Sequence, residues 1–142
     1  MFTLGDAADG AYDLIVMDAF TSDAVPVHLL TREALAIYVR KLAPGGMILM
    51  HVMNRHMELI SVATGVASAN GLVTRVRETT DIDDDEHYLY GSSVAAIARA
   101  DADFGPLATL PDWKIQQPDP VQWVWTDDYS NIIGAMIRHY RR

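Results

Sequence analysis

Residues 12–30 have the sequence YDLIVMDAFTSDAVPVHLL, and the fold prediction starts from this stretch. Its apolar residues lead straight into Asp18, a pattern typical of a strand that is buried on both faces of a parallel sheet. A second acid, Asp23, follows before Pro26. Because ligands of open α/β sheets bind beyond the carboxyl ends of the strands, both carboxylates are candidate site residues.

The rest of the chain predicts an α/β fold. The first half is expected to hold a helix over 32–43 capped by Thr31, a strand over 47–53, and a helix from Asn54 to the Asn70–Gly71 pair. Two strands, over 72–78 and 87–99, should follow, and a helix over 130–141 should end the chain. Pro44, Gly45 and Gly46 are expected to end the first helix.

The first two strands are joined by a helix and are therefore expected to be parallel. The connection between the last two strands is too short for a crossover helix, so these strands should form an antiparallel hairpin. After Arg99 the sequence predicts no regular structure until the terminal helix, which would place four apolar residues on one face: Ile133, Met136, Ile137 and Tyr140. We expect a single domain over residues 1–142.

Composition narrows the possible functions. The 142 residues include no cysteine, which excludes disulfides and thiolate metal sites and favours a cytoplasmic protein. The formal net charge is −8, and no basic cluster is present to neutralise phosphates, so nucleic-acid binding is disfavoured. No apolar run is long enough to cross a membrane. An acidic surface favours cationic ligands, polyamines included, although many proteins are acidic only for solubility.

Several polar residues have both a structural and a functional interpretation. His28 follows Asp23 and could line a cleft, or it could pack against its neighbours without a functional role. His51 lies in an apolar strand and is interpreted as a satisfied core histidine. The acidic run at 81–87 lacks the glycine and glutamate positions of an EF-hand loop and is interpreted as a solvated hairpin tip. No metal site is predicted.

The segment 123–131, WVWTDDYSN, also has two interpretations. In the first, Asp127 or Ser130 caps the terminal helix and the tryptophans fill the core. In the second, the segment folds over the cleft beside the strand ends, and Asp128 and Tyr129 contact the substrate. The sequence favours capping but leaves both interpretations open.

Four segments together resemble the spermidine synthase-like proteins: GDA (5–7), YDLIVMDAFTSDAVPVHLLT (12–31), LAPGGMILMHVMNR (42–55) and VWTDDYSN (124–131). That family consists of S-adenosyl-cofactor-dependent transferases with the class I methyltransferase fold. The resemblance implies a partial class I methyltransferase (Rossmann-like) sheet, in which two parallel strands continue into an antiparallel pair. It covers the C-terminal half of that fold, because the family's glycine-rich cofactor half would precede GDA.

The resemblance also implies roles for individual residues. Asp18 matches the catalytic acid that deprotonates the attacking amine, and Asp23 matches the second substrate-binding acid, although the intervening loop is longer than usual. Asp6 and Ala7 match the positions that bind the adenine of the cofactor, which would be decarboxylated S-adenosylmethionine or S-adenosylmethionine. An ordinary loop aspartate is an equally good interpretation of Asp6.

The expected function is aminopropyl transfer from decarboxylated S-adenosylmethionine to a polyamine or other small amine. Without the cofactor half the chain is expected to be impaired or inactive alone. Cofactor binding is left open, with the alternative that this chain binds none by itself. One alternative is a non-catalytic subunit, in which a homodimer or a partner chain covers the open strand edge at 12–18. The other is a methyltransferase that uses S-adenosylmethionine, because fold does not fix chemistry.

Overall fold

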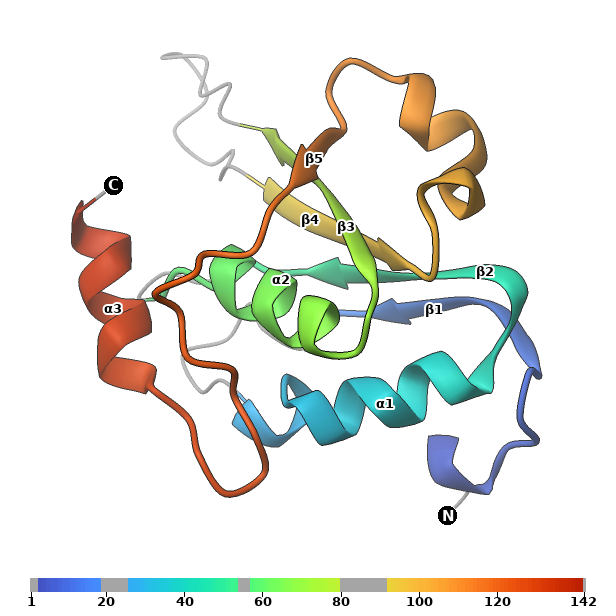
Figure 1. Ribbon diagram of the computed structural model, residues 1–142, viewed down its shortest axis with the longest axis horizontal. Helices are drawn as coiled ribbons and strands as arrows, with labels where there is room; N and C mark the ends of the chain where they lie inside the picture. The colour runs from blue at the N-terminus through green and yellow to red at the C-terminus, as the bar shows by residue number, and fades with distance from the viewer. Residues whose placement is uncertain (1–2, 19–25, 54–56, 80–91, 142) are drawn as a thin grey trace.

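The computed structural model describes residues 3–18, 26–53, 57–79 and 92–141 (Figure 1). Its strands are β1 (Tyr12–Met17), β2 (Leu42–His51), β3 (Val73–Thr79), β4 (Ser92–Ala98) and β5 (Lys114–Gln116). Its α-helices are α1 (Arg32–Lys41), α2 (Ile60–Ala69) and α3 (Ile132–Arg141), and its short 3₁₀ segments are η1 (Leu4–Asp6), η2 (Val27–Leu29) and η3 (Asp101–Thr109).

The strands form one mixed sheet with the order β1-β2-β4-β3-β5. β1 and β2 are parallel, and every other pairing is antiparallel. The predicted α/β class, the parallel pair and the β3–β4 hairpin are confirmed. The sequence did not predict β5, because its three residues are too few to show an alternating pattern, and it is placed only by pairing with β3.

Helix α1 begins as the sequence predicts. The side chain of Thr31 accepts a hydrogen bond from the backbone amide of Ala34 at 3.1 Å, which satisfies one of the free amides of the first turn. The helix ends at Lys41, two residues earlier than expected, because β2 begins at once with Leu42.

The stretch 44–46, which was expected only to end the first helix, lies inside β2. A Cβ at Gly46 would lie 3.0 Å from the carbonyl oxygens of both Ala43 and Asp13. Since Asp13 belongs to β1, the glycine allows the backbones of the parallel pair to approach closely.

Helix α2 begins at Ile60, so the prediction of a start at Asn54 was wrong, and Asn54 itself lies outside the described residues. Met53 and Glu58 form an isolated antiparallel bridge before the helix begins. The first turn is capped instead by Glu58, whose Oε1 accepts a hydrogen bond from the amide of Ser61 at 3.0 Å.

Helices α1 and α2 cover one face of the sheet and enclose the main core (Figure 1). On the opposite face Phe104 of η3 packs against Ala96 and Ala98 of β4. This second cluster does not cover β1, where Leu14 is 48 % and Val16 is 64 % exposed. The expectation that β1 is buried on both faces was therefore wrong for the described residues, because an apolar run does not specify what packs over it.

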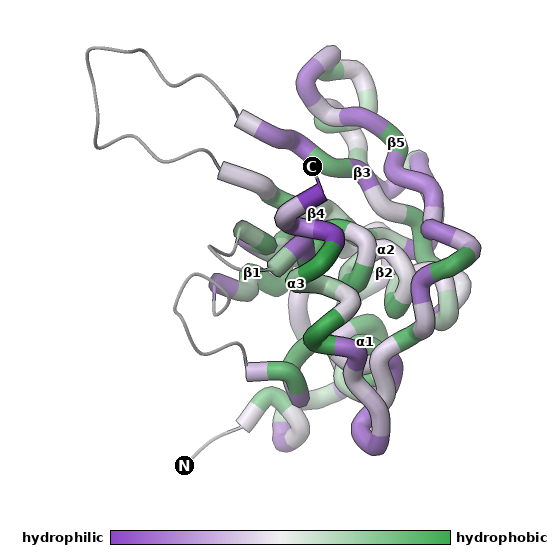
Figure 2. The backbone as a smooth tube through the Cα atoms, turned by 90° about the vertical axis from the view of Figure 1, so that its left-hand side faces the viewer, coloured by the Kyte–Doolittle hydropathy of each residue, from purple (hydrophilic) through white to green (hydrophobic). Residues whose placement is uncertain are grey.

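Helix α3 lies across the end of the sheet, and Figure 2 views the molecule from that side. Its N-cap is neither Asp127 nor Ser130, as the sequence suggested, but Asn131, whose Oδ1 accepts a hydrogen bond from the amide of Gly134 at 2.8 Å. Asn, like Asp and Ser, is a strong N-cap residue, and the residue next to the first helical turn takes the role.

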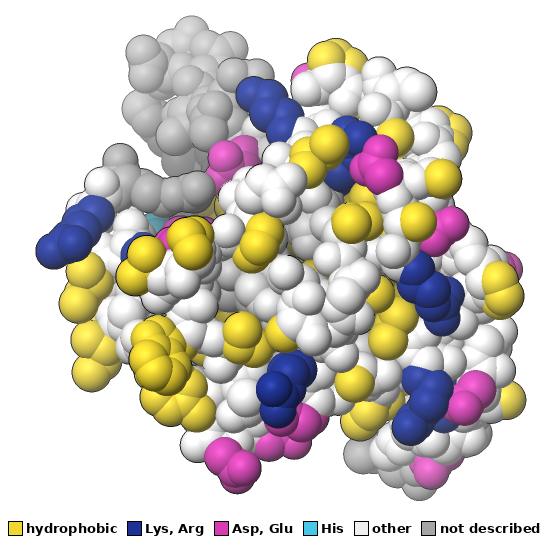
Figure 3. Space-filling view, viewed as in Figure 1, with side chains coloured by type: hydrophobic (Ala, Val, Ile, Leu, Met, Phe, Trp, Pro, Cys, Tyr) yellow, Lys and Arg dark blue, Asp and Glu magenta, His cyan; other side chains and the backbone are white. Residues whose placement is uncertain are grey.

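The predicted apolar face of α3 is exposed to solvent, whereas Ala135 on another face is fully buried. Figure 3 shows hydrophobic side chains gathered over this helix. The exposed members of the face are Ile133, Met136, Ile137 and Tyr140.

The two neighbouring tryptophans allow a matched test of the packing. Trp125 is 0 % exposed and Trp123 is 71 % exposed. We expect Trp125→Ala to lower the free energy of unfolding by about 3–5 kcal/mol, because it leaves a large cavity in the core. Trp123→Ala should change it by about 0.5 kcal/mol or less. Urea unfolding followed by circular dichroism measures both values, and equal losses would contradict the burial of Trp125 and the exposure of Trp123.

Candidate functional site

The carboxyl ends of β1 and β2 lie side by side, because the two strands are parallel and in register up to the Met17–Met50 pair. Asp18 directly follows β1, and His51 is the last residue of β2. Asp18 Oδ1 lies 3.0 Å from His51 Nδ1, and the Asp18 side chain is 66 % exposed. The sheet thus places an accessible carboxylate where ligands of α/β folds bind.

His51 also contacts β4, since its Nε2 lies 3.3 Å from Ser92 Oγ. The histidine side chain is 30 % exposed, so it is not the fully enclosed core residue that the sequence suggested. The sequence pattern did not identify His51 and Ser92 as site residues. The sequence indicates them only weakly as site residues, because each lies at the end of a strand. The pairing of β2 with β4 is needed to bring them together.

A cavity of about 400 Å³ contains three of the predicted substrate-binding residues, His28, Asp128 and Tyr129. Its remaining lining comes from η2, the start of α1 and the loop before α3: Pro26, Val27, Thr31, Thr126, Asp127 and Ser130. Because α1 follows β1 and returns along the sheet, its first turn lies at the same end of the sheet as Asp18 (Figure 1).

Hydrogen bonds to α1 hold the loop that forms this cavity. Thr31 Oγ1 donates to Asp127 Oδ1 at 2.7 Å, and the amide of Asp127 donates to Glu33 Oε2 at 3.0 Å. The amide of Arg32 donates to the carbonyl of Trp125 at 2.8 Å. Asp127 therefore fixes the loop to the start of α1 instead of capping α3.

Tyr38 lies beneath this region. Its hydroxyl donates to the carbonyl of Leu29 at 3.0 Å, and the residue is 6 % exposed. Burial, with a smaller contribution from the charge of Asp127, raises the pKa of Tyr38 to about 12.

The raised pKa predicts a loss of stability at high pH. The phenol is favoured in the folded state, so its contribution is complete below about pH 10, where an unfolded tyrosine ionises, and is lost as the pH rises towards 12. Tyr38→Phe removes a hydrogen bond worth about 1 kcal/mol at neutral pH. We expect the stability gap between the wild type and Tyr38→Phe to narrow over this range in urea titrations.

The control for that titration is Tyr140→Phe, because Tyr140 is 72 % exposed. The difference in free energy of unfolding between the wild type and Tyr140→Phe should not change with pH. If the difference between the wild type and Tyr38→Phe also stayed constant, burial of the Tyr38 phenol would not explain the loss of stability.

Asp6 and Ala7, the predicted cofactor-binding residues, lie at the other end of the parallel pair from Asp18. Lys41, the last residue of α1, donates from Nζ to the carbonyl of Ala7 at 2.6 Å, which places Ala7 near the start of β2. Asp6 accepts hydrogen bonds from the hydroxyl and amide of Thr3, at 2.7 and 2.9 Å. These bonds hold the pKa of Asp6 below its usual value. In the described structure Asp6 stabilises a turn.

Two other predicted features lie outside the described residues. They are Asp23, the second substrate-binding acid, and the acidic hairpin tip at 81–87.

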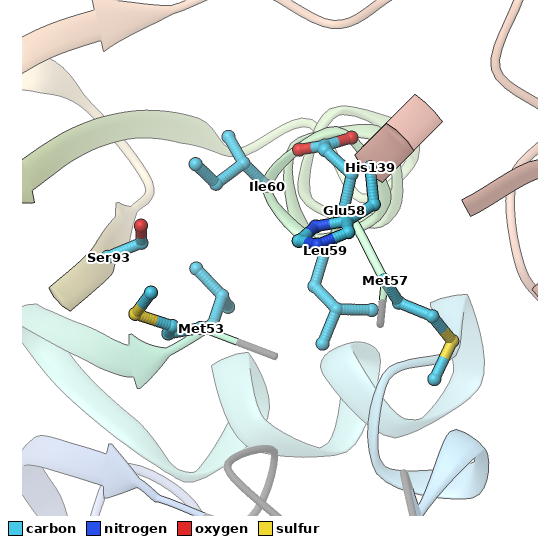
Figure 4. Close-up of a pocket in the computed structure, with 8 residues that line it drawn as sticks. Met53, Met57, Glu58, Leu59, Ile60, Ser93 and His139 are labelled. Atoms are coloured by element: carbon cyan, nitrogen blue, oxygen red, sulfur yellow. The ribbon is translucent and has the colours of Figure 1, made fainter. Parts of the chain in front are cut away.

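A second cavity, of about 180 Å³, lies between the ends of β2 and β4 and helix α3 (Figure 4). Met53 and Met57 contribute thioethers, and Ser93 and His139 contribute polar groups. Glu58 also lines the cavity, although its side chain is only 3 % exposed.

Glu58 is paired with Arg138 of α3, whose Nε lies 3.5 Å from Glu58 Oε2. The amide of Glu58 also donates to the carbonyl of Ala135 at 3.0 Å. The two contacts attach α3 to the segment before α2.

Breaking this buried pair should be costly. Arg138→Met leaves the Glu58 carboxylate without its counter-charge, and we expect the free energy of unfolding to fall by roughly 3–5 kcal/mol at pH 7. The double variant Glu58→Gln, Arg138→Met should recover at least half of that loss, because no buried charge remains. Arg141→Met, at an exposed position of the same helix, serves as the control. No recovery in the double variant would contradict the pairing.

Comparisons with protein-family models, curated proteins and solved structures found no match. In the described part of the chain, no three histidine, cysteine or acidic side chains gather closely enough to hold a metal ion. No helix among the described residues has the length and apolar character needed to span a membrane.

Proposed function

We propose that this chain is the amine-binding part of a spermidine synthase-like transferase, and that Asp18 is the acid that binds the amine and takes its proton. The observation that carries the proposal is the exposed Asp18 carboxylate at the carboxyl end of β1. A carboxylate there attracts a cationic amine and can accept a proton during nucleophilic attack. Support comes from the strand order, two parallel strands followed by an antiparallel pair, which the family resemblance implies.

The cavity with His28, Asp128 and Tyr129 supports a cationic ligand. Asp127 and Asp128 both line it, and the chain as a whole carries a formal charge of −8. A polyamine has several ammonium groups, so one end could reach Asp18 while another lies against these acids. The aromatic face of Tyr129 would add a cation–π contact.

The complete reaction would use decarboxylated S-adenosylmethionine, which supplies an electrophilic carbon next to a sulfonium. The described residues do not fit this group: Asp6 and Ala7 lie at the opposite end of β1 from Asp18, and the Ala7 carbonyl is already bonded to Lys41. We therefore assign only amine binding to this chain.

A second candidate function is that of an interaction subunit. In the described residues β1 pairs on one side only, with β2, and its Leu14 and Val16 are exposed. An open strand edge beside apolar side chains favours pairing with a second copy or with a partner chain.

Calorimetric titration with putrescine and spermidine tests the amine proposal. We expect the wild type to bind, and Asp18→Asn to weaken binding by about tenfold or more, because losing one charge-assisted contact costs about 1.5–3 kcal/mol. Asp13→Asn is the matched control, since Asp13 is an exposed acid on the same strand.

The controls separate the two candidates. Equal weakening in both variants would mean that only the net charge attracts the amine. No binding by the folded wild type would reject the amine proposal, and a dimer found by light scattering would then favour the interaction subunit.

A further inference from the structure

Three polar side chains form a row across the carboxyl edge of the sheet. Asp18 Oδ1 lies 3.0 Å from His51 Nδ1, and His51 Nε2 lies 3.3 Å from Ser92 Oγ. The row crosses three adjacent strands, because β2 lies between β1 and β4. Within β4, Ser92 shares a face with Val94, the registered partner of His51. Strand pairing thus sets this alignment.

The two contacts favour one arrangement of protons for a neutral His51. A carboxylate only accepts hydrogen bonds, so this tautomer carries its hydrogen on Nδ1, facing Asp18. Nε2 then carries a lone pair and accepts the hydroxyl hydrogen of Ser92. A base within hydrogen-bond reach of a hydroxyl, itself held by a carboxylate, is the arrangement that activates a serine. Such contacts are often somewhat long before a substrate binds.

We propose that Asp18, His51 and Ser92 form a nucleophilic serine site that reacts with activated acyl groups, such as esters and thioesters. His51 Nε2 takes the Ser92 proton while Ser92 Oγ forms a bond to the carbonyl carbon. The bond to the leaving group then breaks, and the leaving group takes the proton from His51. Water, deprotonated by His51, attacks the acyl-serine, releases the carboxylic acid and restores the Ser92 hydroxyl. Asp18 is a positioning residue that stabilises the imidazolium.

The surroundings of the row indicate an apolar acyl group. Leu14 and Val16 alternate onto the face of β1 that also carries Asp18, and they are 48 % and 64 % exposed. Val16 is registered with Leu49, which is on the same face of β2 as His51. An alkyl chain bound along Leu14 and Val16 would have its carbonyl end near the polar row.

This acyl chemistry goes beyond the proposed amine binding. The two sites have Asp18 in common, but His51 and Ser92 take no part in amine binding as proposed. Variants of the histidine and the serine therefore test this inference independently.

Covalent labelling of the full chain tests the proposal. The probe is a biotinylated fluorophosphonate: the serine oxygen bonds to phosphorus, fluoride leaves, and His51 passes the proton to solvent. We expect one adduct per chain, located on Ser92 by peptide mass spectrometry. Ser92→Ala should abolish it, and His51→Gln should slow it by about 100-fold or more, because general-base catalysis contributes about 10²–10⁴-fold.

Two further variants complete the test. Ser93→Ala is the matched control, because adjacent residues of a strand point to opposite faces, and it should label at the wild-type rate. Asp18→Asn should slow labelling and also shift the imidazole hydrogen from Nδ1 to Nε2 in ¹⁵N NMR spectra. No adduct on the folded wild type, an adduct on another residue, or an unchanged rate in folded His51→Gln would overturn the proposal.

Discussion

The parallel pairing of β1 with β2 is the constraint on which the candidate site depends. Parallel strands end at the same edge of a sheet, so the residue after β1 and the last residue of β2 become neighbours. The contact between Asp18 and His51 follows from this register. The pairing itself needs close backbone approach at Gly46, where a side chain would meet the carbonyl of Asp13. Gly46, near the start of the paired strands, thus supports the contact between Asp18 and His51 at their carboxyl ends.

The sheet is covered unequally, and this asymmetry links the fold to its possible partners. Helices α1 and α2 cover one face and enclose the main core, whereas on the other face Phe104 and its neighbours pack over β2 and β4 and do not reach β1. The uncovered part includes Leu14 and Val16, next to the open edge of β1. The same region carries the row of Asp18, His51 and Ser92. A partner that covered β1 would therefore also control access to these side chains.

The C-terminal segment connects the site to the helices. The loop around Asp127 is bonded to the start of α1, and α3 is attached through Arg138 and Glu58. These contacts are far apart in the sequence and bring His28, Asp128 and Tyr129 into one cavity. These contacts leave the apolar face of α3 exposed to solvent, although an amphipathic pattern normally indicates a helix face that packs on a core. The pattern shows which face is apolar and does not show whether it is covered.

The sequence was sufficient where local chemistry dominates: Thr31 capping α1, the apolar run of β1 leading to Asp18, and the short connection that makes β3 and β4 a hairpin. Long-range pairing decided the rest. The position of Asp6 away from Asp18, the cap at Asn131, the exposure of Val16 and the contacts of His51 all depend on residues distant in the chain. Periodicity and capping rules describe one element at a time, whereas the site is built where separate elements meet.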